Sequence, residues 1–187
     1  DSPESTRPRG TSQLVDGAVP YLLDAYQGEQ SVAFVSQIGI GEQPSLTIDL
    51  QSVQPLNRIH LHPTDLSDTV PQSTPPGFGV PRRFVIDGAT LPDFSDASRL
   101  VECRVQTLFD VNPIMMFRFP RQNCRYVRLT ALEPYINTEF PNAGSQIGFA
   151  EIEVFSRGRN VALNSPVSAN FRIVERAISG RSIETIT

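Results

Sequence analysis

The stretch Leu56-Asn-Arg-Ile-His-Leu-His62 alternates apolar and polar side chains. In an extended strand Ile59 and Leu61 lie on one face and the two histidines lie on the other, because successive side chains point to opposite faces. This alternation is typical of an antiparallel sheet that has one face on a core and the other toward solvent. We therefore predict a half-buried strand here.

Six further segments have the length and composition of strands and are separated by turn residues. They are residues 45–50, 83–87, 100–105, 114–119, 125–130 and 150–155. The 16 prolines and 12 glycines interrupt every longer helical candidate, so we expect only a helix of one or two turns around residues 21–26. Seven short strands with almost no helix predict an all-β protein, an antiparallel β-sandwich or jelly roll.

Three connections between the strands are unusually long, at about residues 38–45, 63–81 and 133–146. Connections in compact domains usually have about two to six residues, and much longer ones are commonly functional or disordered. These loops are therefore the first place to look for a binding site.

The net charge of −4 gives the chain no basic field that would attract nucleic acid or an anionic membrane. No apolar stretch approaches the roughly 18–20 residues that cross a bilayer. We therefore expect neither a nucleic-acid partner nor a membrane span. The sequence also lacks the Gly-x-Ser-x-Gly motif of a nucleophile elbow, which favours a non-catalytic protein. A glycosidase pair stays open, because 20 acidic residues offer many pairs of carboxylates.

Two cysteines, Cys103 and Cys124, enclose a loop of 20 residues. In an oxidising compartment a disulfide between them would stabilise the fold by about 3 kcal/mol. In the cytosol they would be ordinary buried thiols. The sequence alone leaves both alternatives open, because it does not give the distance between the two Cα atoms.

The order and spacing of several motifs resemble the galactose-binding-like superfamily, which includes the discoidin domains of coagulation factors and many carbohydrate-binding modules. The motifs are Leu14–Gly17, Leu46–Leu50, Arg58–Pro63, Val80–Gly88, Arg125–Ala131 and Ile147–Phe155. The resemblance covers about residues 12–157. It implies an antiparallel jelly-roll β-sandwich, in agreement with the strands predicted above.

Members of this superfamily often hold a structural calcium ion. An Asp-Gly segment near the start and an Ala-Glu pair at the last strand provide ligands there, and they match Asp16-Gly17 and Ala150-Glu151 here. The resemblance therefore implies calcium as a cofactor, with oxygen ligands. The sequence departs from the pattern after Gly17, where a Ser or Thr that usually adds an oxygen is missing. In the alternative interpretation Asp16 caps a turn and Glu151 is a solvent-facing strand residue.

Sugar recognition requires aromatic rings that stack on sugar faces and fixed polar groups that bind hydroxyls. The second and third long loops contain such residues, and sugar-binding relatives use the same residue types. The candidate ligand-binding residues are His62, Asp65, Phe78, Arg82, Tyr135, Asn137, Phe140 and Asn142. Alternatively, the aromatic rings pack under their loops and Arg82 pairs with an acid.

His60 and His62 share a strand face, which is the spacing found in cupin-type metal sites. The chain has no third histidine, so a zinc or iron site would need Asp65 or a distant carboxylate as a further ligand. The alternatives are a solvated strand face, or one histidine that points into a ligand loop.

These observations predict a non-catalytic carbohydrate-binding accessory domain of a larger secreted, periplasmic or cell-surface protein, which tethers that protein to a glycan or polysaccharide. The main alternative is a structural domain that docks neighbouring domains of the same chain, and a less favoured one is a jelly-roll enzyme acting on glycosides. We predict an N-terminal extension at residues 1–11, the sandwich at 12–157, and a linker or the start of a second module at 158–187.

Overall fold

The computed structural model of the chain describes residues 10–19, 34–39, 41–64, 77, 79–107, 110–111, 114–136 and 144–173, and the backbone of residues 176–179 and 182–185. The helix predicted around residues 21–26 lies outside these residues. No helix in the described part of the chain is long and apolar enough to cross a membrane.

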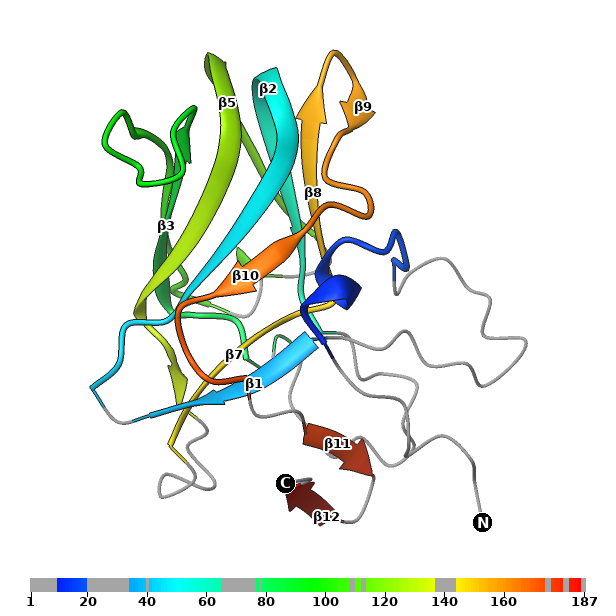
Figure 1. The fold of residues 1–187 in the computed structure, drawn as a ribbon. Coiled ribbons are helices and arrows are strands. Elements are labelled where there is room, and N and C mark those ends of the chain that lie inside the picture. Colours follow the sequence, from blue (N-terminus) through cyan, green and yellow to red (C-terminus); the bar gives the residue numbers. More distant parts are fainter. Residues whose placement is uncertain are drawn as a thin grey trace.

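Two long antiparallel strands, β2 (Ser45–His62) and β5 (Met115–Glu133), form the frame of the fold. Each joins two segments that the sequence presents as separate strands. The pairing register shifts between Asp49 and Gln54, and Gln51 has a φ of 63°, which regular strand geometry does not allow. Figure 1 shows β2 and β5 folding over at the top of the molecule. Each strand therefore contributes one half to each of two layers.

The first layer is built around the second half of β5. β3 (Arg83–Ala89) pairs with this half, and β4 (Ser98–Arg104) pairs with the other edge of β3. The first half of β2 lies on the other side of β5 and pairs in turn with the short β10 (Val167–Ala169). The layer therefore has the order β4-β3-β5-β2-β10.

The second layer contains the other halves of β2 and β5. β8 (Glu151–Ser156) pairs antiparallel with the second half of β2, and β9 (Arg159–Asn160) pairs with β8. This register places His60 directly opposite Glu153 and His62 directly opposite Glu151.

A third, smaller sheet lies at the end of the sandwich where β2 begins and ends (Figure 1). Its strands follow the order β1 (Phe34–Ile38), β7 (Ser145–Phe149) and β6 (Tyr135–Ile136). β6 and the start of β7 fall inside the predicted loop 133–146, so the connection between them is shorter than expected. A 3-10 helix, η2 (Thr11–Leu14), contacts this sheet.

The core lies between the two layers. Ile59 and Leu61 are fully buried, as their alternation with the histidines predicts. The largest fully buried side chains are Phe34, Phe84 and Phe149, and each one removes enough apolar surface from water to stabilise the fold by about 1.5–3 kcal/mol. The predicted all-β sandwich is confirmed.

The sheet and the core both extend beyond residue 157, where we predicted the sandwich to end. β9 and β10 belong to the sheet, and Ala162 is fully buried in the core between them. The chain then continues to a separate two-stranded sheet of β11 (Arg176–Ser179) and β12 (Ser182–Thr185). The segment that starts at residue 158 is therefore part of the sandwich at least as far as Ala169.

Candidate functional site

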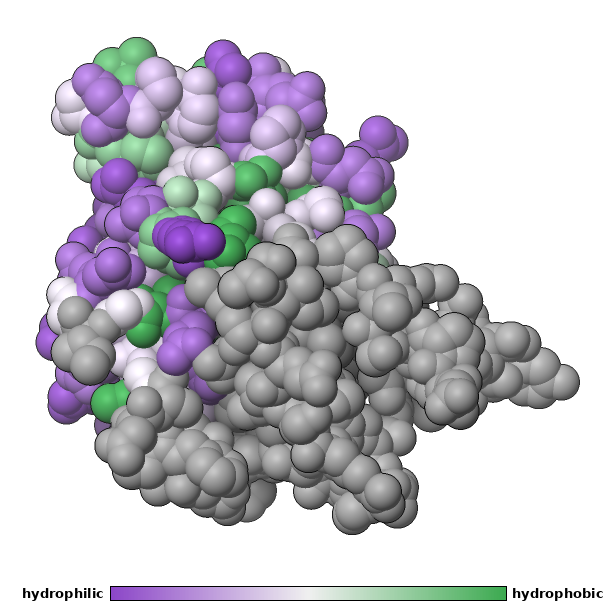
Figure 2. All heavy atoms as spheres, turned by 60° about the horizontal axis from the view of Figure 1, so that its bottom comes forward, coloured by the Kyte–Doolittle hydropathy of each residue, from purple (hydrophilic) through white to green (hydrophobic). Residues whose placement is uncertain are grey.

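The two predicted ligand loops begin and end at the same end of the sandwich, because β2 and β5 fold over. Figure 2 turns this end forward, and the described residues around it are mainly hydrophilic with hydrophobic residues between them. Of the candidate ligand-binding residues, the structure describes His62, Arg82 and Tyr135. The others lie outside the described residues, namely Asp65, Phe78, Asn137, Phe140 and Asn142.

Arg82 lies beside the end of β5, which comes two residues before Tyr135. The backbone N–H of Arg82 donates to the carbonyl of Glu133 (2.8 Å), and the carbonyl of Arg82 accepts from the N–H of Val105 (2.7 Å). The side chain of Arg82 is exposed. Tyr135 lies two residues beyond Glu133 on β6, is partly buried, and pairs with Gln146 of β7. The backbone of Arg82 is therefore held by two hydrogen bonds next to β3, and that of Tyr135 by strand pairing.

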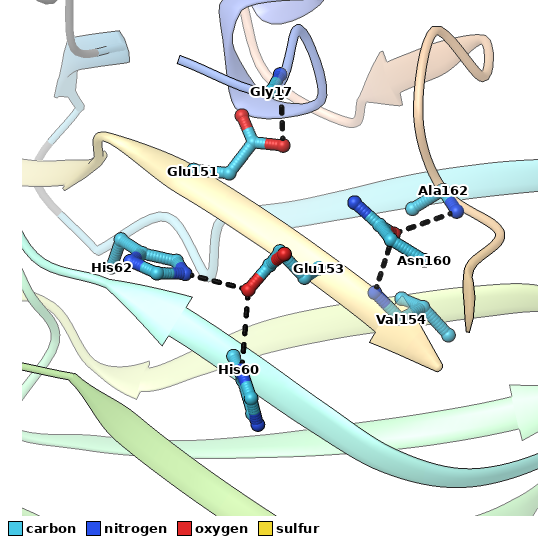
Figure 3. Close-up of polar contacts among 8 residues, drawn as sticks. All are labelled: Gly17, His60, His62, Glu151, Glu153, Val154, Asn160 and Ala162. Carbon is cyan, nitrogen blue, oxygen red and sulfur yellow. Dashed lines mark hydrogen bonds and ion pairs between the residues drawn. The ribbon is translucent and has the colours of Figure 1, made fainter. Parts of the chain in front are cut away.

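His62 belongs to a different cluster. Its side chain is only 3% exposed, and its Nε2 lies 2.8 Å from Oε2 of Glu153 on β8. Oε2 of Glu153 also lies 3.2 Å from Nδ1 of His60 (Figure 3). Glu153 is thus a distant carboxylate of the kind that a metal site at the two histidines would need, and the sequence alone did not identify it. The alternation in segments 56–62 and 150–155 shows which residues share a face of each strand. It does not show that the two strands pair, which is what brings Glu153 to the histidines.

The structure brings together the two segments that resemble a calcium site. The N–H of Gly17 donates to Oε1 of Glu151 (3.2 Å), which connects the start of the chain to the start of β8 (Figure 3). Asp16 caps its own turn, because its Oδ1 accepts a hydrogen bond from the N–H of Ala18 (2.8 Å). Glu151 is fully buried, so the solvent-facing alternative for this residue is wrong. Ala150 is also buried, and its N–H donates to the carbonyl of His62.

The Glu151 carboxyl group lies in an environment that opposes its ionisation. Burial raises its pKa to about 8, and the negative charges of Asp16 and Glu153 act in the same direction. The N–H of Gly17 lowers the pKa and does not compensate for burial. Oε2 of Glu151 is buried and accepts no hydrogen bond from the described residues. The Asp16 carboxylate is near enough to affect the pKa of Glu151. Oxygen atoms of this kind are the ligands that a hard cation such as calcium prefers.

Cys103 and Cys124 are free thiols, so the bridge considered as one alternative is not formed. Cys103 on β4 lies opposite Phe84 of β3. The sulfur of Cys124 instead lies against Gly88, four residues further along β3. Burial raises the pKa of Cys124 to about 11, so this thiol stays protonated at neutral pH and is a poor nucleophile.

No protein-family model matches the chain, and no curated protein matches it. Several solved structures share its fold. A fragment of a Bacteroides thetaiotaomicron protein assigned as a chitobiase has a TM-score of 0.55 and 13% identity, over 81% of this chain and 78% of that one. The F5/8 type C domain of a Bacteroides fragilis protein has a TM-score of 0.52 and 12% identity, over 81% and 83%. The C-terminal domain of a Bacteroides fragilis chitobiase has a TM-score of 0.51 and 15% identity, over 81% and 83%. These similarities confirm the predicted fold, an antiparallel β-sandwich.

Proposed function

We propose that the chain is a non-catalytic carbohydrate-binding domain of a larger extracellular or periplasmic protein. The observation that carries this proposal is the fold, which the chain shares with an F5/8 type C domain and with domains from two proteins described as chitobiases. Such a domain acts by holding its parent protein on a glycan, which raises the local concentration of glycan around a neighbouring domain.

The arrangement of Arg82 and Tyr135 supports this proposal. An exposed arginine offers up to five N–H donors to sugar hydroxyls, and a tyrosine ring offers a flat surface for the apolar face of a sugar. Because backbone hydrogen bonds hold Arg82 and strand pairing holds Tyr135, little backbone entropy is lost when a ligand binds. The two side chains therefore form the described part of the proposed glycan site.

We further propose that Glu151 and Asp16 help to hold a structural calcium ion. The buried Oε2 of Glu151 would gain a partner, and the ion would keep the carboxylate charged despite its burial. Backbone carbonyls would have to complete the six to eight oxygen ligands that calcium takes, because the usual Ser or Thr is absent. In this role calcium would fix the start of the chain against β8.

Calorimetric titration of the full chain with a panel of oligosaccharides tests the glycan site. For a sugar that the wild type binds, we expect Arg82→Ala and Tyr135→Ala each to weaken binding at least tenfold, equivalent to about 1.4 kcal/mol. Arg121→Ala is the matched control, because Arg121 is an exposed arginine of β5 near the opposite end of the sandwich. Unchanged binding by both Arg82→Ala and Tyr135→Ala would place the glycan site elsewhere.

Thermal unfolding tests the calcium proposal. Millimolar calcium should raise the Tm of the chelator-treated wild type at pH 7, because an ion that binds only the folded state stabilises it. The gain should disappear in Glu151→Gln and remain in Glu102→Gln, which changes an exposed glutamate of β4. An equal rise in Tm in all three proteins would show that Glu151 is not a calcium ligand.

A further inference from the structure

Two histidines and one glutamate lie side by side on the outer face of the second layer. β2 and β8 pair with His60 opposite Glu153, and His62 lies two residues further along β2 on the same face. Figure 3 shows the Glu153 carboxylate turned toward both imidazoles, whereas the Glu151 carboxylate is turned away toward Gly17. The cluster is therefore separate from the proposed calcium ligands.

Each of the three side chains offers one potential ligand atom, and Oε2 of Glu153 is close to both imidazole nitrogens. Oε2 of Glu153 lies 3.2 Å from Nδ1 of His60 and 2.8 Å from Nε2 of His62. The three ligand atoms all lie within 4.8 Å of one another. A tetrahedral zinc site with bonds of about 2.0–2.1 Å has ligand atoms about 3.3–3.4 Å apart. Small side-chain rotations would therefore bring these atoms to the distances that zinc requires.

The surroundings hold the two rings in place and leave the cluster accessible. His62 is 3% exposed, while the side chains of His60 and Glu153 are 14% and 20% exposed. The ring of Phe155 packs against the ring of His60, with 4.6 Å between the ring centroids. The Cζ atom of Arg58 lies 4.1 Å from the centroid of the Phe155 ring. This packing limits the rotations open to His60, so its Nδ1 stays directed toward Glu153. Glu153 is the most exposed of the three side chains, so an ion would enter past this residue.

The chemistry of the three groups selects the class of metal. Imidazole nitrogen suits borderline metals such as zinc, cobalt, nickel and copper, whereas calcium and magnesium prefer oxygen ligands. Two nitrogens and one carboxylate oxygen are also a common protein ligand set for zinc, with water or another group in the fourth position.

We propose that His60, His62 and Glu153 bind a divalent metal ion of the zinc class. Such an ion would connect β2 to β8 through side chains, in addition to the backbone hydrogen bonds between them. β8 begins at Glu151, so the ion would stabilise the strand that also provides the proposed calcium ligand.

Metal titration of the full chain, prepared without a histidine tag and after chelator treatment, tests this proposal. We expect one equivalent of Zn²⁺ to bind in competition with a chromophoric chelator, and one equivalent of Co²⁺ to give the visible absorption of a tetrahedral or five-coordinate site. Because His60 and His62 are the only histidines in the sequence, their NMR signals report on the site directly. Both sets of imidazole signals should change on addition of Zn²⁺.

Two variants remove one ligand each with little change in volume, Glu153→Gln and His60→Gln. Both should weaken Zn²⁺ binding at least tenfold, because loss of even an outer partner of a metal ligand commonly costs tenfold or more. Glu102→Gln is the control and should bind Zn²⁺ as the wild type does, whereas Glu151→Gln distinguishes this site from the proposed calcium ligands. Circular dichroism before each titration shows whether a variant is folded. If one of the two ligand variants does not fold, the other one carries the test.

Three results would overturn the proposal. The first is a wild type that binds no stoichiometric Zn²⁺. The second is wild-type affinity in folded Glu153→Gln and His60→Gln, which would leave the cluster as a hydrogen-bonded group only. The third is loss of Zn²⁺ binding in Glu151→Gln but not in Glu153→Gln, which would assign the ion to the calcium ligands. None of these results bears on glycan binding, so the proposed function is tested separately.

Discussion

Glu151 begins a strand in which alternation predicts that it faces solvent together with Glu153. The Glu153 side chain is 20% exposed, whereas Glu151 is fully buried. The difference arises because Gly17 lies over the start of β8 and donates its N–H to the Glu151 carboxylate. A segment more than a hundred residues away in the sequence therefore changes the ionisation of this residue.

At the residue scale, this burial predicts a pH-dependent stability in the presence of chelator. The folded-state pKa of Glu151, about 8, lies above its ordinary value of 4.5, so the folded state binds the proton more tightly than the unfolded state does. This contribution to stability is complete below pH 4.5 and is lost as the pH rises toward 8. As the pH rises through this range, the Glu151 carboxyl group alone should lower the free energy of unfolding by up to about 1.4 kcal/mol per pH unit.

Glu151→Gln isolates the effect, because the amide cannot ionise. Urea unfolding at pH 5, 6, 7 and 8 in EDTA should show a smaller decrease in stability for this variant than for the wild type. Glu102→Gln should follow the wild type, since Glu102 is exposed. If the curves of the wild type and Glu151→Gln run parallel, the Glu151 carboxyl group does not titrate in this range.

At the scale of elements, β1 and β7 approach each other closely at Gly148. A Cβ at this position would lie 2.9 Å from the carbonyl oxygen of Phe34 and 2.9 Å from Cγ2 of Val35. Because the oxygen belongs to the backbone of the paired strand, it cannot move without separating the strands. We expect Gly148→Ala to destabilise the fold by about 1–3 kcal/mol.

Gly10→Ala is the control for this prediction. A Cβ at Gly10 would make only an ordinary contact of 3.7 Å with Oγ of Ser12, and we expect a change within about 0.5 kcal/mol. Chemical denaturation of both variants measures the difference. A Gly148→Ala variant as stable as Gly10→Ala would show that β1 and β7 can separate without cost.

All seven segments predicted as strands fall on strands of the structure, but the sequence missed β1, β7 as a paired strand, and β10. Segments 45–50 and 56–62 were recognised, but their union in β2 depends on β5, which pairs with both. β1 and β7 were missed as paired strands because Ser36 and Gln146 are buried among apolar residues and interrupt the pattern. β10 has only three residues, too few to show a period.

In the molecule as a whole, a candidate site that depends on pairing between distant segments was predictable only where the resemblance linked those segments. The resemblance linked Asp16-Gly17 to Ala150-Glu151, and the structure brings these segments together. The partner of the two histidines was not identified, because any of many acidic residues could have paired with them. Only the register of β2 against β8 selects Glu153.

The sandwich includes residues beyond 157, and a pair of neighbouring substitutions tests this extent. Ala162 is fully buried, whereas the next residue, Leu163, is 49% exposed. Ala162→Glu would bury an unpaired charge and should destabilise the fold by about 3 kcal/mol or more. Leu163→Glu should change the stability much less. Equal tolerance of both substitutions in denaturation experiments would mean that this segment is not part of the core.

A glycan array probed with the full chain in calcium-containing buffer tests whether this sandwich binds carbohydrate. We predict selective binding to a chemically related subset of glycans, retained by Arg121→Ala and reduced by Arg82→Ala and Tyr135→Ala. An array that contains galactosides and plant, algal and chitin-derived oligosaccharides, and that shows no binding by the folded wild type, would contradict the proposed function.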